Sequence, residues 1–581
     1  MTTLNKEKRI IKEEVRFAWH LPKNKFRDDD YHYVKYAITY EDGIIEPQVR
    51  LIKNFQRPIF ITKESYRNHK EKKEFEIRDK LLMLKCTESD KDITVAQALG
   101  KPYLANNIDE LKNSPYVYAY DITSTSLIKY ITLRKNNFIS TPYSIATFDI
   151  EINPKTNEII IASLAFKNKI YVSVLQKFVK NIGVLETRLK TSFSTLLPNH
   201  SDYSIELEIC DSELNIIEKI FEKANNWAPD FLAIWNMNFD IPIILNRIKY
   251  YNKNPIDYLC DKSISREFRV CKYKQGITKK ITASGIVKPI NPSLQWHTLI
   301  LTAKFYVIDA MCVYRQLRMA KQEESSYSLD AILKKELNTS KLKFEQAKEY
   351  NGIAWHLFMQ ENYPVEYIVY NMYDVISMID LDNKIKDLTS TLPSFTGITD
   401  FSKFNSNPKK IVDALFIFGL ERNKIIGTVE KINKKEEEIS NPELEEIINE
   451  DTEEEIENKY NVNKYKTLSL KNWIQLLPQD HLLHSSGLKI FNDYKNIITF
   501  IRGMVVDLDC ISSYPSCTLA ANVSKETTVT ELIEIENIKE NIFREMNLSI
   551  PMGATNMLEY CNVMFNLPNL LELHNILERK I

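Results

Sequence analysis

Two acidic residues occupy alternate positions of an otherwise apolar segment, residues 146–152 (ATFDIEI). The alternation predicts a β-strand, in which the side chains of Asp149 and Glu151 point to the same face. Neighbouring carboxylates repel each other, and a divalent cation between them turns that repulsion into attraction. The segment therefore predicts a metal site on the surface of a sheet.

Two more acidic residues lie in similar apolar surroundings. Asp240 follows a predicted buried strand, residues 231–235, and Asp374 lies in a predicted helix, residues 367–381, with Tyr370 one turn before it. Taken singly, each acidic motif has a simpler explanation. Asp149 and Glu151 could form an exposed strand face, Asp240 could cap a helix, and Tyr370 with Asp374 could be a surface pair. Taken together they indicate one shared site, because an unpaired carboxylate among apolar residues is unfavourable.

The elements around these residues predict the scaffold of the site. Residues 158–166 and 169–175 are two β-rich runs separated by two polar residues, which predicts a hairpin that continues the same sheet. Residues 214–224 have helical spacing of apolar residues, and Ser328 can cap a helix that begins at Leu329.

The three acidic motifs read FDIE, NMNFD and YNMYD in chain order. They resemble the DEDD exonuclease superfamily, Tyr subtype, whose pattern is Asp-x-Glu, Asn-x(2 or 3)-Phe-Asp and Tyr-x-x-x-Asp. The resemblance implies an RNase H-like α/β domain with 3′→5′ exonuclease activity and two Mg²⁺ (or Mn²⁺) ions. Asp149 would bridge both ions, Glu151, Asp240 and Asp374 would complete their ligands, and Tyr370 would hold the attacking water.

A later segment, residues 509–516 (DCISSYPS), resembles the first palm motif of family B DNA polymerases, Asp-x-x-Ser-Leu-Tyr-Pro-Ser. The surroundings of the acidic motifs resemble the same family, in particular the replicative polymerases of T-even-like phages. The resemblance implies that Asp509 binds catalytic Mg²⁺ and that the Cys510 carbonyl adds a ligand. Backbone amides around Ser512 and Ser513 would hold the incoming dNTP, and Tyr514 would lie under its sugar.

The family's fingers motif, Lys-x-x-x-Asn-Ser-x-Tyr-Gly, and its second palm acid, in an Asp-Thr-Asp turn, are not found in this sequence. Asp507 is a competing candidate for the palm metal ligand, but only Asp509 has the right spacing to Ser512 and Tyr514. One palm aspartate cannot hold two ions. We therefore expect that this chain alone cannot synthesise DNA. It would be either the front subunit of a split polymerase, completed by a second polymerase chain with fingers, remaining palm and thumb, or a truncated product. Expected partners are primer–template DNA, a single-stranded 3′ end, dNTP and this second chain. A sliding clamp is a further candidate partner.

Two other functions are compatible with the same residues. The first is a stand-alone exonuclease with a vestigial palm. The second is a non-catalytic scaffold that binds primer–template DNA or replisome partners, which the complete set of acids disfavours.

The predicted fold class is a multidomain α/β protein. Its predicted parts are a mixed α+β N-terminal domain (1–140), an exonuclease domain (141–390), a return segment to the N-terminal domain (391–427), an acidic linker (428–465) and a partial palm with the start of the fingers (466–581). Residues 263–279 alternate basic and apolar residues around a glycine. They lie where family B polymerases have a β-hairpin that helps to move the primer end between sites, so the resemblance implies a hairpin that contacts DNA. The alternative is an edge hairpin protected by lysines.

Composition limits the remaining possibilities. The formal net charge is −1, so any DNA-binding surface must be local. The 8 cysteines form no CxxC pair, which argues against a zinc site and fits a reducing cytoplasm. The sequence has no apolar run long enough to span a bilayer, so we expect a cytoplasmic protein without a membrane partner.

Overall fold

The structure is a computed structural model that describes residues 9–136, 141–281, 287–318, 323–394, 401, 416–417 and 419–428. All of them belong to the first of the two units into which the chain divides, Met1–Ile448. Among the residues described, no helix combines the length and the apolar character needed to cross a membrane. The predicted palm residues Asp509, Cys510, Ser512, Ser513 and Tyr514, and the acidic linker beyond residue 428, lie outside the described residues.

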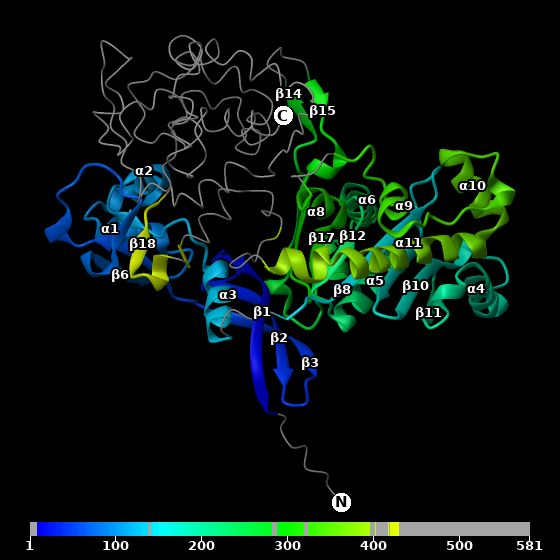
Figure 1. Cartoon of the computed structure of the whole chain (residues 1–581), viewed down its shortest axis with the longest axis horizontal. Coiled ribbons are helices and arrows are strands. Elements are labelled where there is room, and N and C mark those ends of the chain that lie inside the picture. Colours follow the sequence, from blue (N-terminus) through cyan, green and yellow to red (C-terminus); the bar gives the residue numbers. More distant parts are fainter. Residues whose placement is uncertain are drawn as a thin grey trace, which may run out of the picture. The chain divides into compact units, whose positions relative to one another are not determined.

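A mixed six-stranded sheet is the largest sheet among the described residues (Figure 1). In spatial order its strands are β11 (Ser204–Cys210), β10 (Lys169–Leu175), β9 (Ile159–Phe166), β8 (Ile145–Ile152), β12 (Phe231–Ile234) and β17 (Tyr306–Asp309). β9 pairs antiparallel with both β8 and β10, whereas β12 runs parallel to β8 and β17. The predicted hairpin of β9 and β10 is therefore confirmed.

Helices cover both faces of this sheet, and β8 shows how its side chains divide between them. Phe148 packs against Phe221 of α5 (Glu213–Trp227), with ring centroids 5.8 Å apart. On the opposite face the Thr147 hydroxyl donates a hydrogen bond of 2.7 Å to the Val375 carbonyl of α11 (Pro364–Ile385). The face that carries Asp149 and Glu151 therefore lies against α11, because side chains alternate along a strand.

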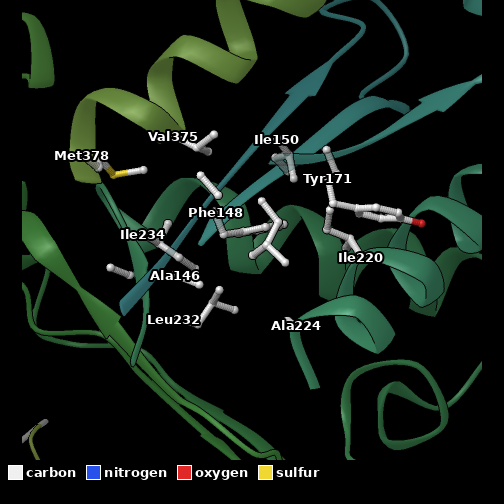
Figure 2. Packing of buried hydrophobic residues seen from close by; sticks show 14 of the residues in the cluster. Ala146, Phe148, Ile150, Tyr171, Ile220, Ala224, Leu232, Ile234, Val375 and Met378 are labelled. Carbon is white, nitrogen blue, oxygen red and sulfur yellow. The ribbon is translucent and has the colours of Figure 1, made fainter. Parts of the chain in front are cut away.

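The apolar core beside these acids is continuous. Figure 2 shows Ala146, Phe148 and Ile150 of β8 next to Leu232 and Ile234 of β12. In the same view Ile220 and Ala224 of α5 lie on one side of the strands, and Val375 and Met378 of α11 lie on the other. All of these residues belong to one buried cluster, so the strand that carries the acids is held from both sides.

The remaining helices follow from their caps and their apolar spacing. The prediction that Ser328 caps a helix from Leu329 is confirmed, because its side chain accepts a hydrogen bond from the Ala331 amide. This helix is α9 (Leu329–Leu337). The described part of the exonuclease region also contains α4 (Ile182–Leu196), α6 (Met237–Tyr250), α7 (Pro255–Leu259), α8 (Ala310–Gln316) and α10 (Gly352–Asn362).

The described residues of the N-terminal part include two three-stranded antiparallel sheets (Figure 1). The first has the order β1 (Ile10–Leu21), β2 (Tyr31–Tyr40), β3 (Ile45–Lys53), and the second has the order β6 (Leu81–Cys86), β4 (Arg57–Thr62), β7 (Val117–Tyr118). The helices are α1 (Lys91–Ala98), α2 (Ile108–Asn113) and α3 (Ser124–Lys135). A late strand, β18 (Lys424–Ile426), pairs with β5 (Phe75–Ile77), so residues 424–426 lie against the N-terminal part.

The prediction of a hairpin within residues 263–279 is wrong. β13 (Cys271–Lys274) pairs antiparallel with the distant β16 (Thr298–Leu301), and β14 (Lys279–Ile281) pairs with β15 (Val287–Pro289). Gly276 packs so closely on another segment that a Cβ there would lie 1.3 Å from the Gln295 carbonyl oxygen. The glycine therefore marks a close approach between segments, which local alternation cannot distinguish from a turn.

Candidate exonuclease site

β8 brings Asp149 and Glu151 to the α11 face of the sheet. A side-chain amide of that helix, Asn371 Nδ2, donates a hydrogen bond of 2.7 Å to Asp149 Oδ2. The hydroxyl of Tyr367, one helical turn earlier, donates a bond of 2.5 Å to Glu151 Oε2. Each predicted β8 acid therefore has one carboxylate oxygen held by a side chain of α11.

α11 also contributes Asp374 and Tyr370, which are neighbours on one face because they are four residues apart. The side-chain nitrogen of Lys341 lies 2.7 Å from Asp374 Oδ2 and donates a longer bond of 3.3 Å to the Tyr370 hydroxyl. Lys341 lies in the segment that follows α9 and was not predicted. Its only sequence signal is a lysine in a loop, and many lysines share that signal.

Three of the four predicted acids form one compact cluster. Asp149, Glu151 and Asp374 each offer a carboxylate oxygen, and these oxygens all lie within 4.8 Å of one another. Such a set of hard oxygen donors fits a divalent cation. The structure thus brings together residues that are more than 220 positions apart in the chain.

Asp240, the fourth predicted acid, lies beside this cluster but outside the group of three. It is in the first turn of α6, is 1% exposed, and its Oδ1 has no hydrogen-bond partner within the described structure. Its carboxylate interacts with the backbone amide of Ile150 on β8. This amide is accessible from α6 because β12 pairs with β8 only as far as Thr147.

Burial and mutual repulsion disfavour the charged forms of these acids. Burial raises the pKa of Asp149 well above its usual range, and the charges of Asp240 and Asp374 add to the increase. Burial raises the pKa of Glu151 to about 7, although the hydrogen bond from Tyr367 opposes the shift. A bound cation would reverse this preference, so the electrostatics agree with the donor set in favouring a metal site.

The position of α6 depends on a buried aspartate that the sequence did not reveal. Asp309 is the last residue of β17 and caps α8, where its Oδ1 accepts hydrogen bonds from the Met311 and Cys312 amides at 3.0 and 3.2 Å. Its Oδ2 accepts a bond of 2.8 Å from the amide of Met237, the first residue of α6. Asp309 therefore ties the helix that carries Asp240 to the edge of the sheet.

The tyrosine predicted to hold the attacking water is buried near the cluster. The Tyr370 ring lies beside Trp355, with ring centroids 5.1 Å apart, and is stacked on Tyr367 at 5.9 Å. Burial raises the pKa of the Tyr370 hydroxyl above its usual value, and the charge of Asp374 adds to this effect. The hydroxyl therefore keeps its proton at neutral pH and is able to donate it in a hydrogen bond.

Comparison with known proteins relates part of this chain to a polymerase family. Residues 88–332 match the family described as DNA polymerase family B, exonuclease domain, a range that includes Asp149, Glu151 and Asp240 but ends before Asp374. A DNA-directed DNA polymerase of Escherichia phage RB69 is 30% identical over 217 residues, which make up 36% of this chain and 20% of the relative. The matched stretch thus spans about one fifth of that relative's length. The chain therefore contains a family B DNA polymerase exonuclease region.

Proposed function

We propose that this chain is a divalent-metal-dependent 3′→5′ exonuclease that removes nucleotides from a single-stranded DNA end, in the proofreading role of a family B polymerase. The observation that carries the proposal is the cluster of Asp149, Glu151 and Asp374, with the buried Asp240 beside it. The family match supports DNA as the substrate and divalent ions as the cofactor class. The mixed sheet, with helices on both faces, is compatible with an RNase H-like fold for residues 141–390.

The side chains around the cluster suggest how the reaction proceeds. Two Mg²⁺ or Mn²⁺ ions, held by Asp149, Glu151, Asp240 and Asp374, would supply an activated water and stabilise the leaving oxygen. In the proposed mechanism Tyr370 orients that water through its hydroxyl. Lys341 reduces the negative charge that the phosphate must approach, because its ammonium group lies beside Asp374.

An exposed aromatic residue next to the site supports a single-stranded substrate. Phe239 precedes Asp240 in the first turn of α6 and is 50% exposed, although it is a large apolar side chain. An aromatic ring in this position can stack on an unpaired base without sequence preference. We propose that Phe239 contacts the terminal base while the adjacent Asp240 faces the scissile phosphate.

The proposal extends to DNA synthesis. Asp509, the Cys510 carbonyl, Ser512, Ser513 and Tyr514 would form part of a polymerase site that binds dNTP, and a further polypeptide would supply fingers, remaining palm and thumb. Primer–template DNA, and in some assemblies a sliding clamp, would be bound by the complete polymerase. The predicted domain boundaries belong to this proposal, and the pairing of β18 with β5 supports a return segment that reaches the N-terminal domain.

The test uses the purified full-length chain with a single-stranded oligonucleotide labelled at its 5′ end, in Mg²⁺ or Mn²⁺. We expect stepwise shortening from the 3′ end that Asp149→Ala and Asp374→Ala abolish. Asp380→Asn is the matched control, because Asp380 lies on the same helix but bonds His200. A wild-type chain that binds primer–template DNA without shortening it would overturn the proposal in favour of a scaffold.

The second part of the proposal is tested with the same preparation. We expect no incorporation of dNTP by the isolated chain and co-purification with a polypeptide that carries an Asp-Thr-Asp turn. Incorporation by the isolated chain would show that no second polypeptide is needed. Processing of DNA ends without such a partner in the cell would favour the stand-alone exonuclease.

A further inference from the structure

The hydroxyl of Tyr367 lies at the centre of a hydrogen-bond network that joins three elements. Tyr367 is fully buried on α11, and its hydroxyl donates to Glu151 Oε2 on β8. His356 Nδ1, from α10, lies 2.7 Å from the same hydroxyl. Gln360 Nε2, one turn further along α10, donates to it at 3.2 Å.

The chemistry of these groups fixes the direction of each bond. The hydroxyl has one proton, which goes to the carboxylate, and two lone pairs, which remain to accept. His356 must therefore donate from Nδ1, and Gln360 uses one of its two amide protons. The hydroxyl of Tyr367 is thus saturated, with one bond donated and two accepted, so its orientation has no alternative of equal energy.

The second amide proton of Gln360 reaches the end of β8 directly. Gln360 Nε2 donates a bond of 2.9 Å to the Ile152 carbonyl. The pairing of β8 with β9 shifts register between Glu151 and Ile152, a β-bulge that interrupts the ladder there. Bulges next to active sites often change the direction of a neighbouring side chain. Gln360 therefore holds the backbone next to Glu151 while Tyr367 holds its carboxylate.

We propose that Tyr367, His356 and Gln360 are positioning residues that present one oxygen of Glu151 to a metal ion and so favour small octahedral ions over Ca²⁺. This inference rests on the proposed function. Glu151 Oε2 is engaged by Tyr367, whereas Oε1 accepts none of the network's bonds. Mg²⁺ prefers near-octahedral ligands with one oxygen from each carboxylate, whereas Ca²⁺ readily accepts both oxygens of a carboxylate that is free to turn.

The test measures binding rather than catalysis. Mn²⁺ and Ca²⁺ are titrated separately into the metal-free, full-length chain by calorimetry at pH 8. For Tyr367→Phe we expect the dissociation constant for Mn²⁺ to rise by roughly 10- to 100-fold, as is typical when the support of a metal ligand is removed. The dissociation constant for Ca²⁺ should rise by a smaller factor, so that the variant discriminates less between the two ions. Tyr363→Phe is the matched control, because its ring packs on Phe358 of α10.

A pair of substitutions at His356 separates positioning from packing. His356→Asn keeps a donor at the place of Nδ1 and should retain near-wild-type binding of Mn²⁺. His356→Leu removes the donor at similar volume and should shift binding in the direction of Tyr367→Phe. Thermal unfolding of the metal-free variants will show whether Tyr367→Phe folds. If it does not, the two His356 variants alone decide whether the network positions Glu151.

The outcomes distinguish the inference from the function on which it rests. If the wild-type chain binds Mn²⁺ in a manner that requires Asp149, but Tyr367→Phe and His356→Leu keep the wild-type preference for Mn²⁺, the inference is overturned and the exonuclease proposal stands. If the wild-type chain shows no Mn²⁺ binding that Asp149→Ala removes, both are overturned. Loss of discrimination in Tyr367→Phe with retention in His356→Asn supports the inference.

Discussion

Lys341 and Asp374 form an ion pair inside the acidic cluster, with Nζ 2.7 Å from Oδ2. Burial alone would lower the pKa of Lys341, but the charges of Asp374 and Asp149 raise it above its usual value. The lysine therefore stays charged and offsets part of the repulsion among the carboxylates. In the sequence it lies outside the three acidic motifs, and it links the loop after α9 to the acidic residue of α11.

Replacement of Lys341 should impair catalysis. Lys341→Met keeps most of the side-chain volume and removes the charge, and we expect the exonuclease rate to fall by roughly 10²-fold, a typical cost for one electrostatic contact at a reacting centre. Burial raises the pKa of Asp374, and Lys341 opposes this increase. Removal of the lysine charge should therefore move the acidic limb of the plot of exonuclease rate against pH to higher pH. Lys343→Met, in the same loop, is the control. An unchanged pH profile in Lys341→Met would contradict this account.

The metal-free chain should lose stability as the pH rises. Burial raises the pKa of folded Glu151 to about 7 from an ordinary value of 4.5, so the folded state binds more protons than the unfolded state between these values. The stabilising contribution is therefore complete below pH 4.5 and is lost as the pH passes 7. Thermal unfolding in a chelator should show a falling midpoint across this interval, with a flatter curve for Glu151→Gln.

The exposed Glu345→Gln serves as the control for that series and should follow the wild type. Added Mn²⁺ should restore stability at high pH, by about 2.7 kcal/mol at a concentration of one hundred times the dissociation constant. A wild-type midpoint that is independent of pH in the chelator would show that Glu151 is not held in an unfavourable charged state.

Phe239 should affect substrate binding more than the chemical step. Its ring is 50% exposed beside Asp240, and the loss of one stacked base costs about 1–3 kcal/mol. We expect Phe239→Ala to raise KM for single-stranded DNA with little change in kcat, because stacking is present in both the ground state and the transition state. Phe239→Trp should retain binding. Steady-state kinetics on a short oligonucleotide measures both constants, and an equal KM for Phe239→Ala and wild type would exclude the stacking role.

Asp309 should contribute to stability and to the placement of Asp240. Asp309→Ala removes a helix cap, at about 1 kcal/mol, and leaves the Met237 amide without its acceptor, at about 1–3 kcal/mol. We expect the free energy of unfolding in urea to fall by about 2–4 kcal/mol, accompanied by reduced exonuclease activity. Ser328→Ala removes only the cap of α9 and should cost about 1 kcal/mol without affecting activity. Equal decreases in the free energy of unfolding for Asp309→Ala and Ser328→Ala would contradict the role of Asp309 in holding the Met237 amide.

Much of the site could be predicted from the sequence because its geometry is local. The two-residue period of a strand places Asp149 and Glu151 on one face, and the four-residue spacing in a helix pairs Tyr370 with Asp374. The β9–β10 hairpin and the Ser328 cap follow from similarly short-range rules. The family resemblance then related these separate segments to one another, which spacing alone does not do.

Only the tertiary structure decided which side chains support the acids. Lys341 is 33 residues from Asp374, and Tyr367 is 216 residues from Glu151, so no periodic pattern connects either pair. The pairing of β13 with β16, which replaced the predicted hairpin, depends in the same way on the choice between distant partners. A sequence specifies local conformation through neighbouring residues, whereas contacts between distant segments depend on how all the buried surfaces pack together.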